Sequence, residues 1–196
     1  MRSTPVIFSA EMVRAILDGK KTQTRRLIKS YISENIRSGM SPLEWESVKK
    51  ICPYGTRKDK LWVRETFVLE SQVEHDQNPP YSDGRPIGGY EDSWLMPHYR
   101  ATDQTPDLMY EGSDEPNCKW KPSIFMPRWA SRICLEIEDI WIERLQDISE
   151  EDAADEGCNL VNGSYVNPYK NLWQSIYGDD SWSENPWVWV VKFIKV

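Results

Sequence analysis

A run of apolar residues at positions 187–194 constrains the fold most, because it predicts a β-strand with apolar side chains on both faces. Trp187 and Trp189 lie on one face of this strand, while Val188 and Val190 lie on the other. A strand that is apolar on both faces has to be covered on both, as happens in the interior of a sheet. We therefore expect residues 187–194 in the middle of a sheet.

Residues 131–145 predict a second long strand, which bends partway along its length. Ile133, Leu135 and Ile137 share one face until Asp139 breaks the alternation, and such a break indicates a bulge. Long, bent strands turn the corners of small barrels. Together with the helices predicted below, these patterns favour an α+β protein in which a small β-barrel is surrounded by helices.

Shorter patterns predict the remaining elements. We expect strands over residues 5–8, 60–69 and 99–101, and helices over residues 10–18, 42–50, 149–156 and 168–177. The third of these helices begins with Ser149 and Asp152 in capping-box spacing. Residues 71–96, which hold several Pro, Gly, Asp and Ser residues, and residues 103–119 are expected to be loops. A length of 196 residues suits one domain, 1–196, with insertions at about 30–58 and 70–120.

Composition excludes several classes of protein. No run approaches the roughly 18 apolar residues that a membrane helix needs, and the N-terminal apolar stretch is too short for a secretory signal. We therefore expect a cytoplasmic protein without a membrane partner. The four cysteines form no Cys-x-x-Cys pair and the two histidines are isolated, so we expect no metal and no other cofactor.

The charge of the chain is unevenly distributed. Residues 1–69 carry 14 Lys and Arg against 7 Asp and Glu, whereas residues 70–196 carry 10 against 24, and together they give the net charge of −7. The basic N-terminal third could meet a phosphate, while the acidic remainder limits a broad nucleic-acid footprint. A small or single-stranded anionic ligand fits this balance better than a long duplex.

The most basic part of the chain is the segment 19–26, which reads Gly-Lys-Lys-Thr-Gln-Thr-Arg-Arg. Gly19 follows the predicted helix 10–18 and is suited to a left-handed C-cap. Five cations then lie within ten residues: Lys20, Lys21, Arg25, Arg26 and Lys29. Cations at a helix C-terminus gain about 0.3–1 kcal/mol from the dipole, which explains two of them but not five that repel one another. We therefore expect a loop that binds an anionic or polar ligand.

Two pairs of neighbouring charged residues are further candidates for the site. Glu156, with Asp155 beside it, falls at the end of the predicted helix 149–156, where the dipole disfavours negative charge. It is either a solvated helix end or an acid whose pKa is raised for proton transfer. Arg64 and Glu65 are neighbours on a predicted strand and point to opposite faces, so at most one of them reaches a pocket.

Residues 120–132 interleave aromatic and cationic side chains and contain two prolines that stiffen the segment. Lys121, Arg128 and Trp129 in this segment could stack on a base and hold a phosphate. The alternative is that the aromatic residues pack in the core and the arginines form salt bridges. Sequence alone leaves both interpretations open.

The segment 19–26, the acidic helix and the terminal strand together resemble the ASCH family, a branch of the PUA-like superfamily. Its signature is a Gly, a Lys two residues on and an Arg seven residues after the Gly, which Gly19, Lys21 and Arg26 match. The segment is also similar to the Gly-x-Lys-Thr-x-Thr-x-Arg loop of the small N4-acetylcytidine amidohydrolases. At residues 7–9, 61–66, 126–132 and 185–189 the chain resembles an ASCH-like group encoded in phages and prophages.

The resemblance implies a PUA-like pseudo-barrel with a cleft beside the basic loop, and it implies roles for individual residues. Lys21 and Thr24 would form a catalytic pair, and Glu156 would be the acid. Lys21 would take the proton of the Thr24 hydroxyl as it attacks an amide carbonyl, while Glu156 protonates the leaving amine. Arg26 would steady the developing negative charge. The chain is much longer than the small amidohydrolases, which leaves the substrate open.

Three functions therefore stay open. The first is hydrolysis of an acylated nucleobase amide, the second is noncatalytic binding of RNA or a modified nucleotide by a phage-associated module, and the third is cleavage of single-stranded RNA. The partner in each is a nucleoside, a nucleotide or single-stranded RNA. The expected ligand-binding residues are Gly19, Lys20, Arg26, Arg64, Glu65, Lys121, Arg128 and Trp129.

Overall fold

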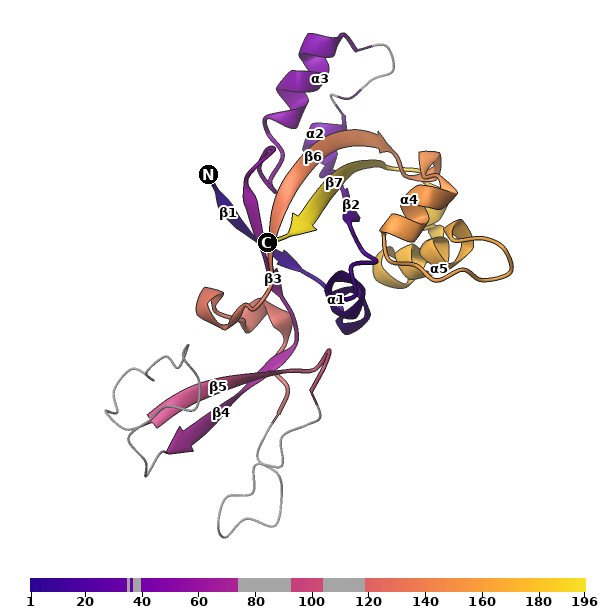
Figure 1. Ribbon diagram of the computed structural model, residues 1–196. Coiled ribbons are helices and arrows are strands. Elements are labelled where there is room, and N and C mark those ends of the chain that lie inside the picture. The colour runs from indigo at the N-terminus through magenta and orange to yellow at the C-terminus, as the bar shows by residue number, and fades with distance from the viewer. Residues whose placement is uncertain (35, 37–39, 74–92, 104–118) are drawn as a thin grey trace. The chain divides into compact units, whose positions relative to one another are not determined.

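The computed structural model describes residues 1–34, 36, 40–73, 93–103 and 119–196 (Figure 1). It contains helices and strands in mixed order, which confirms the α+β class. The chain forms two compact units. The first unit comprises Met1–Val6, Arg14–Val63 and Arg132–Val196, and the second unit comprises Ile7–Val13 and Arg64–Ser131. One domain carrying two insertions stays a prediction.

The first unit is built on a five-stranded sheet in the order β1-β3-β6-β7-β2. Its strands are β1 (Ser3–Ile7), β2 (Gln23–Leu27), β3 (Lys60–Arg64), β6 (Cys134–Arg144) and β7 (Trp187–Lys195). β7 pairs antiparallel with β6 on one side and with β2 on the other, and four successive residues from Val188 are buried. The interior position predicted from its two apolar faces is confirmed.

The bend predicted in the long strand β6 is also confirmed. The register of β6 against β7 shifts between Ile137 and Asp139, so that the strand is bulged where the alternation of side chains breaks. Figure 1 shows β6 and β7 as neighbouring curved strands. In the described part of the chain, β1 and β2 are the edges of the sheet, and the sheet is not closed into a barrel.

The helices begin and end close to where local rules place them. They are α1 (Ala10–Leu17), α2 (Ser30–Ser33), α3 (Pro42–Lys49), α4 (Glu150–Asp155) and α5 (Val166–Tyr177). The predicted capping box of α4 is confirmed, because the Ser149 hydroxyl accepts from the backbone of Asp152 and the Asp152 carboxylate accepts in return. In the described residues no helix combines the length and the apolar composition needed to cross a bilayer.

The core of the first unit lies where α4 and α5 cover β7. A cluster of buried side chains joins these elements, with Trp182 packed against its margin. The members of the cluster are Leu145, Ile148, Ala153, Tyr169, Trp173, Val188 and Val190. Burying an aromatic side chain of this size stabilises a fold by several kcal/mol when all its contacts are counted. The cluster therefore holds α4 in a fixed position, which matters for the site described below.

The second unit contains a two-stranded antiparallel sheet of β4 (Phe67–Val73) and β5 (Ser93–Tyr99). Lys121 extends this sheet on the other side of β4, because its backbone forms a bridge with Phe67. Two short 3₁₀ helices follow, η1 (Ser123–Phe125) and η2 (Arg128–Ala130). A small core of Phe67, Met126 and Ala130 joins the sheet to these helices.

Three predictions about elements are wrong in part. The continuous strand expected over residues 60–69 breaks after Arg64 and resumes at Phe67. The loop expected over residues 71–96 belongs to β4 up to Val73 and to β5 from Ser93, while residues 74–92 lie outside the described residues. Likewise, the strand expected over residues 99–101 is the end of β5, and most of the loop 103–119 lies outside the described residues. β4 carries the polar sequence Glu-Ser-Gln, and its ladder with β5 stabilises a strand that has no apolar alternation.

Candidate functional site

The turn after α1 brings Lys21 to the C-terminal end of α4. Gly19 has φ +73°, the left-handed conformation that glycine adopts without strain. The backbone N–H groups of Lys20 and Lys21 then both donate to the carbonyl of Ala15, at 2.9 and 3.0 Å. Lys21 continues into an antiparallel bridge with Glu156. The helix end therefore positions the basic segment, as the C-cap pattern predicted.

Lys21 and Glu156 form a buried ion pair. The Lys21 Nζ lies 2.6 Å from Glu156 Oε2 and donates a second hydrogen bond of 2.8 Å to the Glu156 carbonyl. The two side chains are 0% and 3% exposed. Burial lowers the pKa of Lys21, an effect that the neighbouring Glu156 carboxylate opposes. Two residues that are 135 positions apart in sequence are thus brought together. Their catalytic roles stay a prediction.

The second carboxylate oxygen of Glu156 is held by Arg25. Glu156 Oε1 accepts a 2.5 Å hydrogen bond from the Arg25 backbone N–H and lies 3.4 Å from Arg25 Nη1. Each oxygen of this buried carboxylate therefore faces a cation. A carboxylate satisfied in this way has a fixed orientation, because rotation would break several charge-assisted hydrogen bonds at once.

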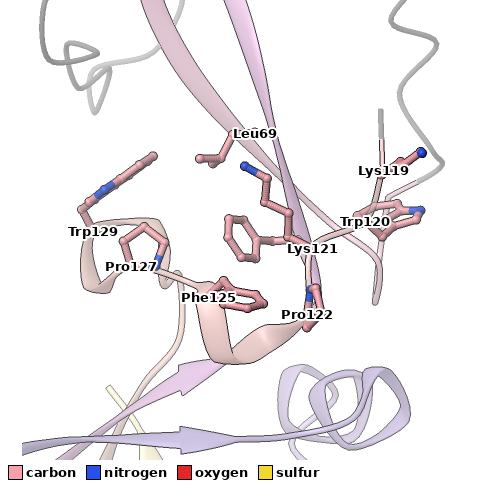
Figure 2. Close-up of a pocket in the computed structure, with 9 residues that line it drawn as sticks. Leu69, Lys119, Trp120, Lys121, Pro122, Phe125, Pro127 and Trp129 are labelled. Carbon is pink, nitrogen blue, oxygen red and sulfur yellow. The ribbon is translucent and has the colours of Figure 1, made fainter. Parts of the chain in front are cut away.

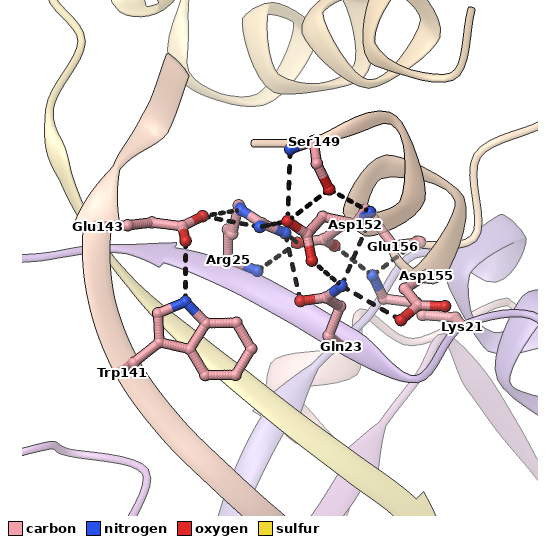
Figure 3. A network of polar contacts seen from close by, with 9 residues as sticks. All are labelled: Lys21, Gln23, Arg25, Trp141, Glu143, Ser149, Asp152, Asp155 and Glu156. Atoms are coloured by element: carbon pink, nitrogen blue, oxygen red, sulfur yellow. Dashed lines mark hydrogen bonds and ion pairs between the residues drawn. The ribbon is translucent and has the colours of Figure 1, made fainter. Parts of the chain in front are cut away.

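Arg25 links Glu156 to the strand β6 and to the first turn of α4 (Figure 3). Its Nε donates to Glu143 Oε1 at 2.7 Å, and its Nη2 lies 2.7 Å from the same oxygen and 3.3 Å from Asp152 Oδ2. Glu143 is itself oriented by the Trp141 indole N–H at 2.8 Å. Two buried cations, Lys21 and Arg25, thus face three carboxylates from two other elements.

Sequence reasoning missed the central place of Arg25 and selected Arg26 instead. The reason is that residues 19–26 were expected to be a loop, which is wrong from Gln23 onward because β2 begins there. In a strand, alternate residues share a face, so Gln23 and Arg25 lie on the same side. Gln23 Nε2 donates to Asp152 Oδ1 at 2.9 Å, in agreement with this placement. Assigning residues 23–27 to a strand would have shown that Gln23 and Arg25 share a face.

The same alternation separates Thr24 from the ion pair. Thr24 is buried, and its position in β2 puts its side chain on the face opposite Gln23 and Arg25. The structure thus brings Lys21 and Glu156 together, but the pleat of β2 directs Thr24 away from its neighbours in the network. The role of Thr24 as a nucleophile stays a prediction.

The remaining cations of the basic segment lie nearer the surface. Lys20 is exposed, and its Nζ lies 3.4 Å from the exposed carboxylate of Asp18. Arg26 is half-buried at the edge of the sheet in β2. Contacts of these two residues with a ligand stay a prediction, as does any contact of Gly19.

Arg64 and Glu65 lie at the start of the second unit, where β3 ends. Arg64 Nε donates to the carbonyl of Met126 at 3.2 Å, which ties this end of β3 to the segment before η2. Glu65 is only 2% exposed. Neither residue lines the pocket described next. Ligand contacts of Arg64 and Glu65 stay a prediction.

A pocket of about 690 Å³ opens on the second unit (Figure 2). Its walls are aromatic and proline-rich with two lysines, and its lining residues are Phe67, Leu69, Lys119, Trp120, Lys121, Pro122, Phe125, Pro127 and Trp129. Phe67 and Leu69 lie two residues apart on β4 and so share one face of the strand. The sheet therefore supplies the apolar floor, and residues 119–129 supply the rim.

Backbone contacts hold the rim of the pocket in place. Lys121 donates to the Phe67 carbonyl at 2.7 Å and accepts from the Phe67 N–H at 3.2 Å. On the opposite margin, the Tyr99 hydroxyl donates to the carbonyl of Ala130 at 2.9 Å. Pro122 and Pro127 immediately precede the two 3₁₀ helices and restrict the backbone there. The pocket is thus formed by a segment that is anchored at both ends.

The pocket contains two of the residues that the sequence predicted to bind a ligand. Lys121 and Trp129 both line it, and Arg128 is exposed at the start of η2 next to Trp129. Lys119 was missed because it falls at the end of a segment expected to be a loop. Phe67 was missed because a strand pattern cannot show which face is covered.

The described residues contain no group of three or more His, Cys, Asp or Glu side chains arranged to hold a metal ion. Comparisons of the chain with protein-family models, with curated proteins and with solved structures found no match. The ASCH resemblance of residues 19–26 and of the segments quoted with it therefore stays a prediction.

Proposed function

We propose that this protein binds a nucleotide or single-stranded RNA, and that the aromatic pocket of the second unit holds the base. The observation that carries the proposal is the pocket itself, in which Trp120, Phe125 and Trp129 line the same cavity as Lys119 and Lys121. Flat aromatic side chains stack on bases, and lysine ammonium groups attract phosphate.

The charge around the pocket supports an anionic ligand. Residues 119–131 contain three Lys and Arg and no Asp or Glu, in a chain whose net charge is −7. Stacking of one base on an aromatic side chain contributes about 1–3 kcal/mol, as judged by alanine substitution. A lysine that contacts phosphate adds a salt-dependent contribution. Together these effects give binding that weakens with salt and depends on an intact aromatic wall.

Titration of the protein with UMP, CMP and AMP by isothermal calorimetry tests the proposal. We expect Trp129→Ala to weaken binding by about 5- to 150-fold, which corresponds to the loss of one stacked base. Lys121→Ala should weaken it less, and the effect should shrink as salt rises. The control is Lys50→Ala, since Lys50 is an exposed lysine at the end of α3 in the first unit. Nucleotide binding that survives Trp129→Ala intact would refute the assignment of the pocket.

A second function, hydrolysis of an acylated nucleobase amide, is favoured by the buried pair of Lys21 and Glu156. A lysine with a lowered pKa has a larger neutral fraction and can accept a proton. In this route the proton shared by the pair would lie on Glu156 and leave Lys21 neutral, and Thr24 would have to turn toward Lys21 from the opposite face of β2. Lys21 would then take the proton of the Thr24 hydroxyl as its oxygen attacks the amide carbonyl, and Glu156 would protonate the amine that leaves. Water would then hydrolyse the acyl ester formed on Thr24 and regenerate the hydroxyl.

Release of acetate from N4-acetylcytidine, followed by NMR, tests the hydrolase proposal. Thr24→Val removes the hydroxyl at nearly constant volume and should abolish turnover, while Lys50→Ala should leave it intact. Turnover in Thr24→Val would rule out the acyl-ester route.

We also propose a PUA-like barrel and a cytoplasmic location for this protein, with ribonuclease activity as the alternative to amide hydrolysis. The barrel is supported by the five-stranded sheet and by the bulge in β6.

A further inference from the structure

We propose that the pocket of the second unit binds a single strand of nucleic acid across at least two nucleotides, with Lys121 and Lys119 on successive phosphates. This inference rests on the proposed function, because it assumes that the pocket accepts a base at all. It goes further in stating that a mononucleotide fills only part of the site.

The two lysines lie two residues apart on the rim of the pocket. Lys121 is held in a bridge with Phe67, and Lys119 lies two residues before it. Figure 2 shows the ammonium group of Lys121 pointing toward Leu69, while that of Lys119 lies above Trp120 and points away from Lys121. Because the two cations diverge, they suit two phosphates better than one.

The aromatic side chains also offer more stacking surface than one base can use. Trp120 and Trp129 line opposite sides of the pocket in Figure 2, with Phe125 between them on the lower wall. Phe125 is 65% exposed, so a large part of its ring is accessible to a ligand. A single base has two faces and cannot stack on walls that lie apart. Successive bases of a strand can occupy these surfaces in turn.

The chemistry of the pocket selects a single strand and not a duplex. Stacking on a tryptophan requires an unpaired base whose face is accessible, and in a duplex both faces are covered by neighbouring pairs. The net charge of −7 also opposes the long phosphate backbones of a duplex outside the basic pocket. A short strand brings its charges only to Lys119, Lys121 and Arg128.

Calorimetric titration with UMP, with oligouridylates of two, four and eight nucleotides, and with an eight-base-pair RNA duplex tests the inference. We expect affinity to rise at least tenfold from UMP to the tetranucleotide and to level off after it. The slope of log K against log salt should steepen from about −0.7 for one phosphate contact to about −1.4 for two. A tetrathymidylate run in parallel shows whether the strand can be DNA as well as RNA.

Two variants test which lysine contacts which phosphate. Lys119→Ala should bring the ratio of tetranucleotide to UMP affinity close to one, whereas Lys121→Ala should lower both affinities. Lys50→Ala should change neither. Thermal unfolding of each variant confirms that it is folded.

The outcomes separate the two proposals. Equal affinity for UMP and the tetranucleotide, or tight binding of an eight-base-pair duplex, would overturn the strand inference and leave nucleotide binding in place. Absence of binding to UMP and to all the oligonucleotides would overturn the proposed function as well.

Discussion

Replacing Lys21 with methionine should destabilise the protein far more than the same change at its neighbour Lys20. Lys21 and Glu156 are 0% and 3% exposed and lie 2.6 Å apart, and removing one partner of such a buried pair costs about 3–5 kcal/mol. Because Glu156 keeps its contacts with Arg25, we expect the lower end, about 3 kcal/mol. Lys20 is 62% exposed and lies 3.4 Å from Asp18, so Lys20→Met should cost less than about 1 kcal/mol.

Urea unfolding followed by tryptophan fluorescence measures the difference. Methionine approximates the length of lysine without its charge, so both substitutions keep most of the packing. The two variants should differ by at least 2 kcal/mol at an unchanged m-value, which is roughly a 30-fold difference in the ratio of folded to unfolded protein. A difference below 1 kcal/mol would refute the reasoning, since it would mean that Lys21 reaches water.

A double-mutant cycle shows whether the cost arises from the pair. In the Lys21→Met background the Glu156 carboxylate keeps only Arg25 as a partner, so adding Glu156→Gln should cost less than the same change in the unaltered protein. Alone, Glu156→Gln should be strongly destabilising, because Lys21 and Arg25 donate to different oxygens and one of these oxygens becomes an amide NH2, which cannot accept. If the two single effects simply added, the residues would not interact.

Three further predictions concern single residues of the first unit. Burial raises the pKa of the Cys52 thiol from about 9 to about 11. The stability that this neutral thiol contributes is therefore present below pH 9 and lost as the pH rises toward 11, so Cys52→Ala should remove about 3 kcal/mol of the alkaline loss of stability measured by urea unfolding. Gly157 and Gly163 have similar φ values of +85° and +80°, but a Cβ at Gly157 would lie 2.8 Å from the Cβ of Ala15, while one at Gly163 would meet no atom within 4 Å. Gly157→Ala should therefore lower the free energy of unfolding by about 1–3 kcal/mol more than Gly163→Ala. Ser149→Ala removes a helix cap and should lower stability by about 1 kcal/mol in thermal unfolding.

The structural features that depend only on residues close in sequence were predictable from the sequence. The capping box at Ser149, the C-cap at Gly19 and the bulge before Asp139 each depend on a few neighbouring residues, and each is found where the pattern placed it. The interior position of β7 was also predictable, because a strand that is apolar on both faces has no other stable place.

The candidate site was less predictable because it depends on partners far apart in sequence. The orientation of Arg25 follows from strand pairing of β2 with β7, and its partner Glu143 lies 118 residues away. The floor of the pocket comes from β4, whose polar middle has no strand pattern and is stabilised by its ladder with β5. Neither long-range pairing leaves a signal in a single sequence.

The structure also weakens the charge-based prediction that residues 19–26 bind an external anion. Repulsion among five cations in ten residues called for an external anion, but two of these cations, Lys21 and Arg25, are buried against carboxylates of the same chain. Glu143, Asp152 and Glu156 supply three negative charges for two positive ones, so no ligand is needed to neutralise them. Residues 119–131, in contrast, contain three cations and no acidic residue. The proposal of an anionic ligand therefore depends on the pocket of the second unit, whose lining combines aromatic side chains with Lys119 and Lys121, and no longer on residues 19–26.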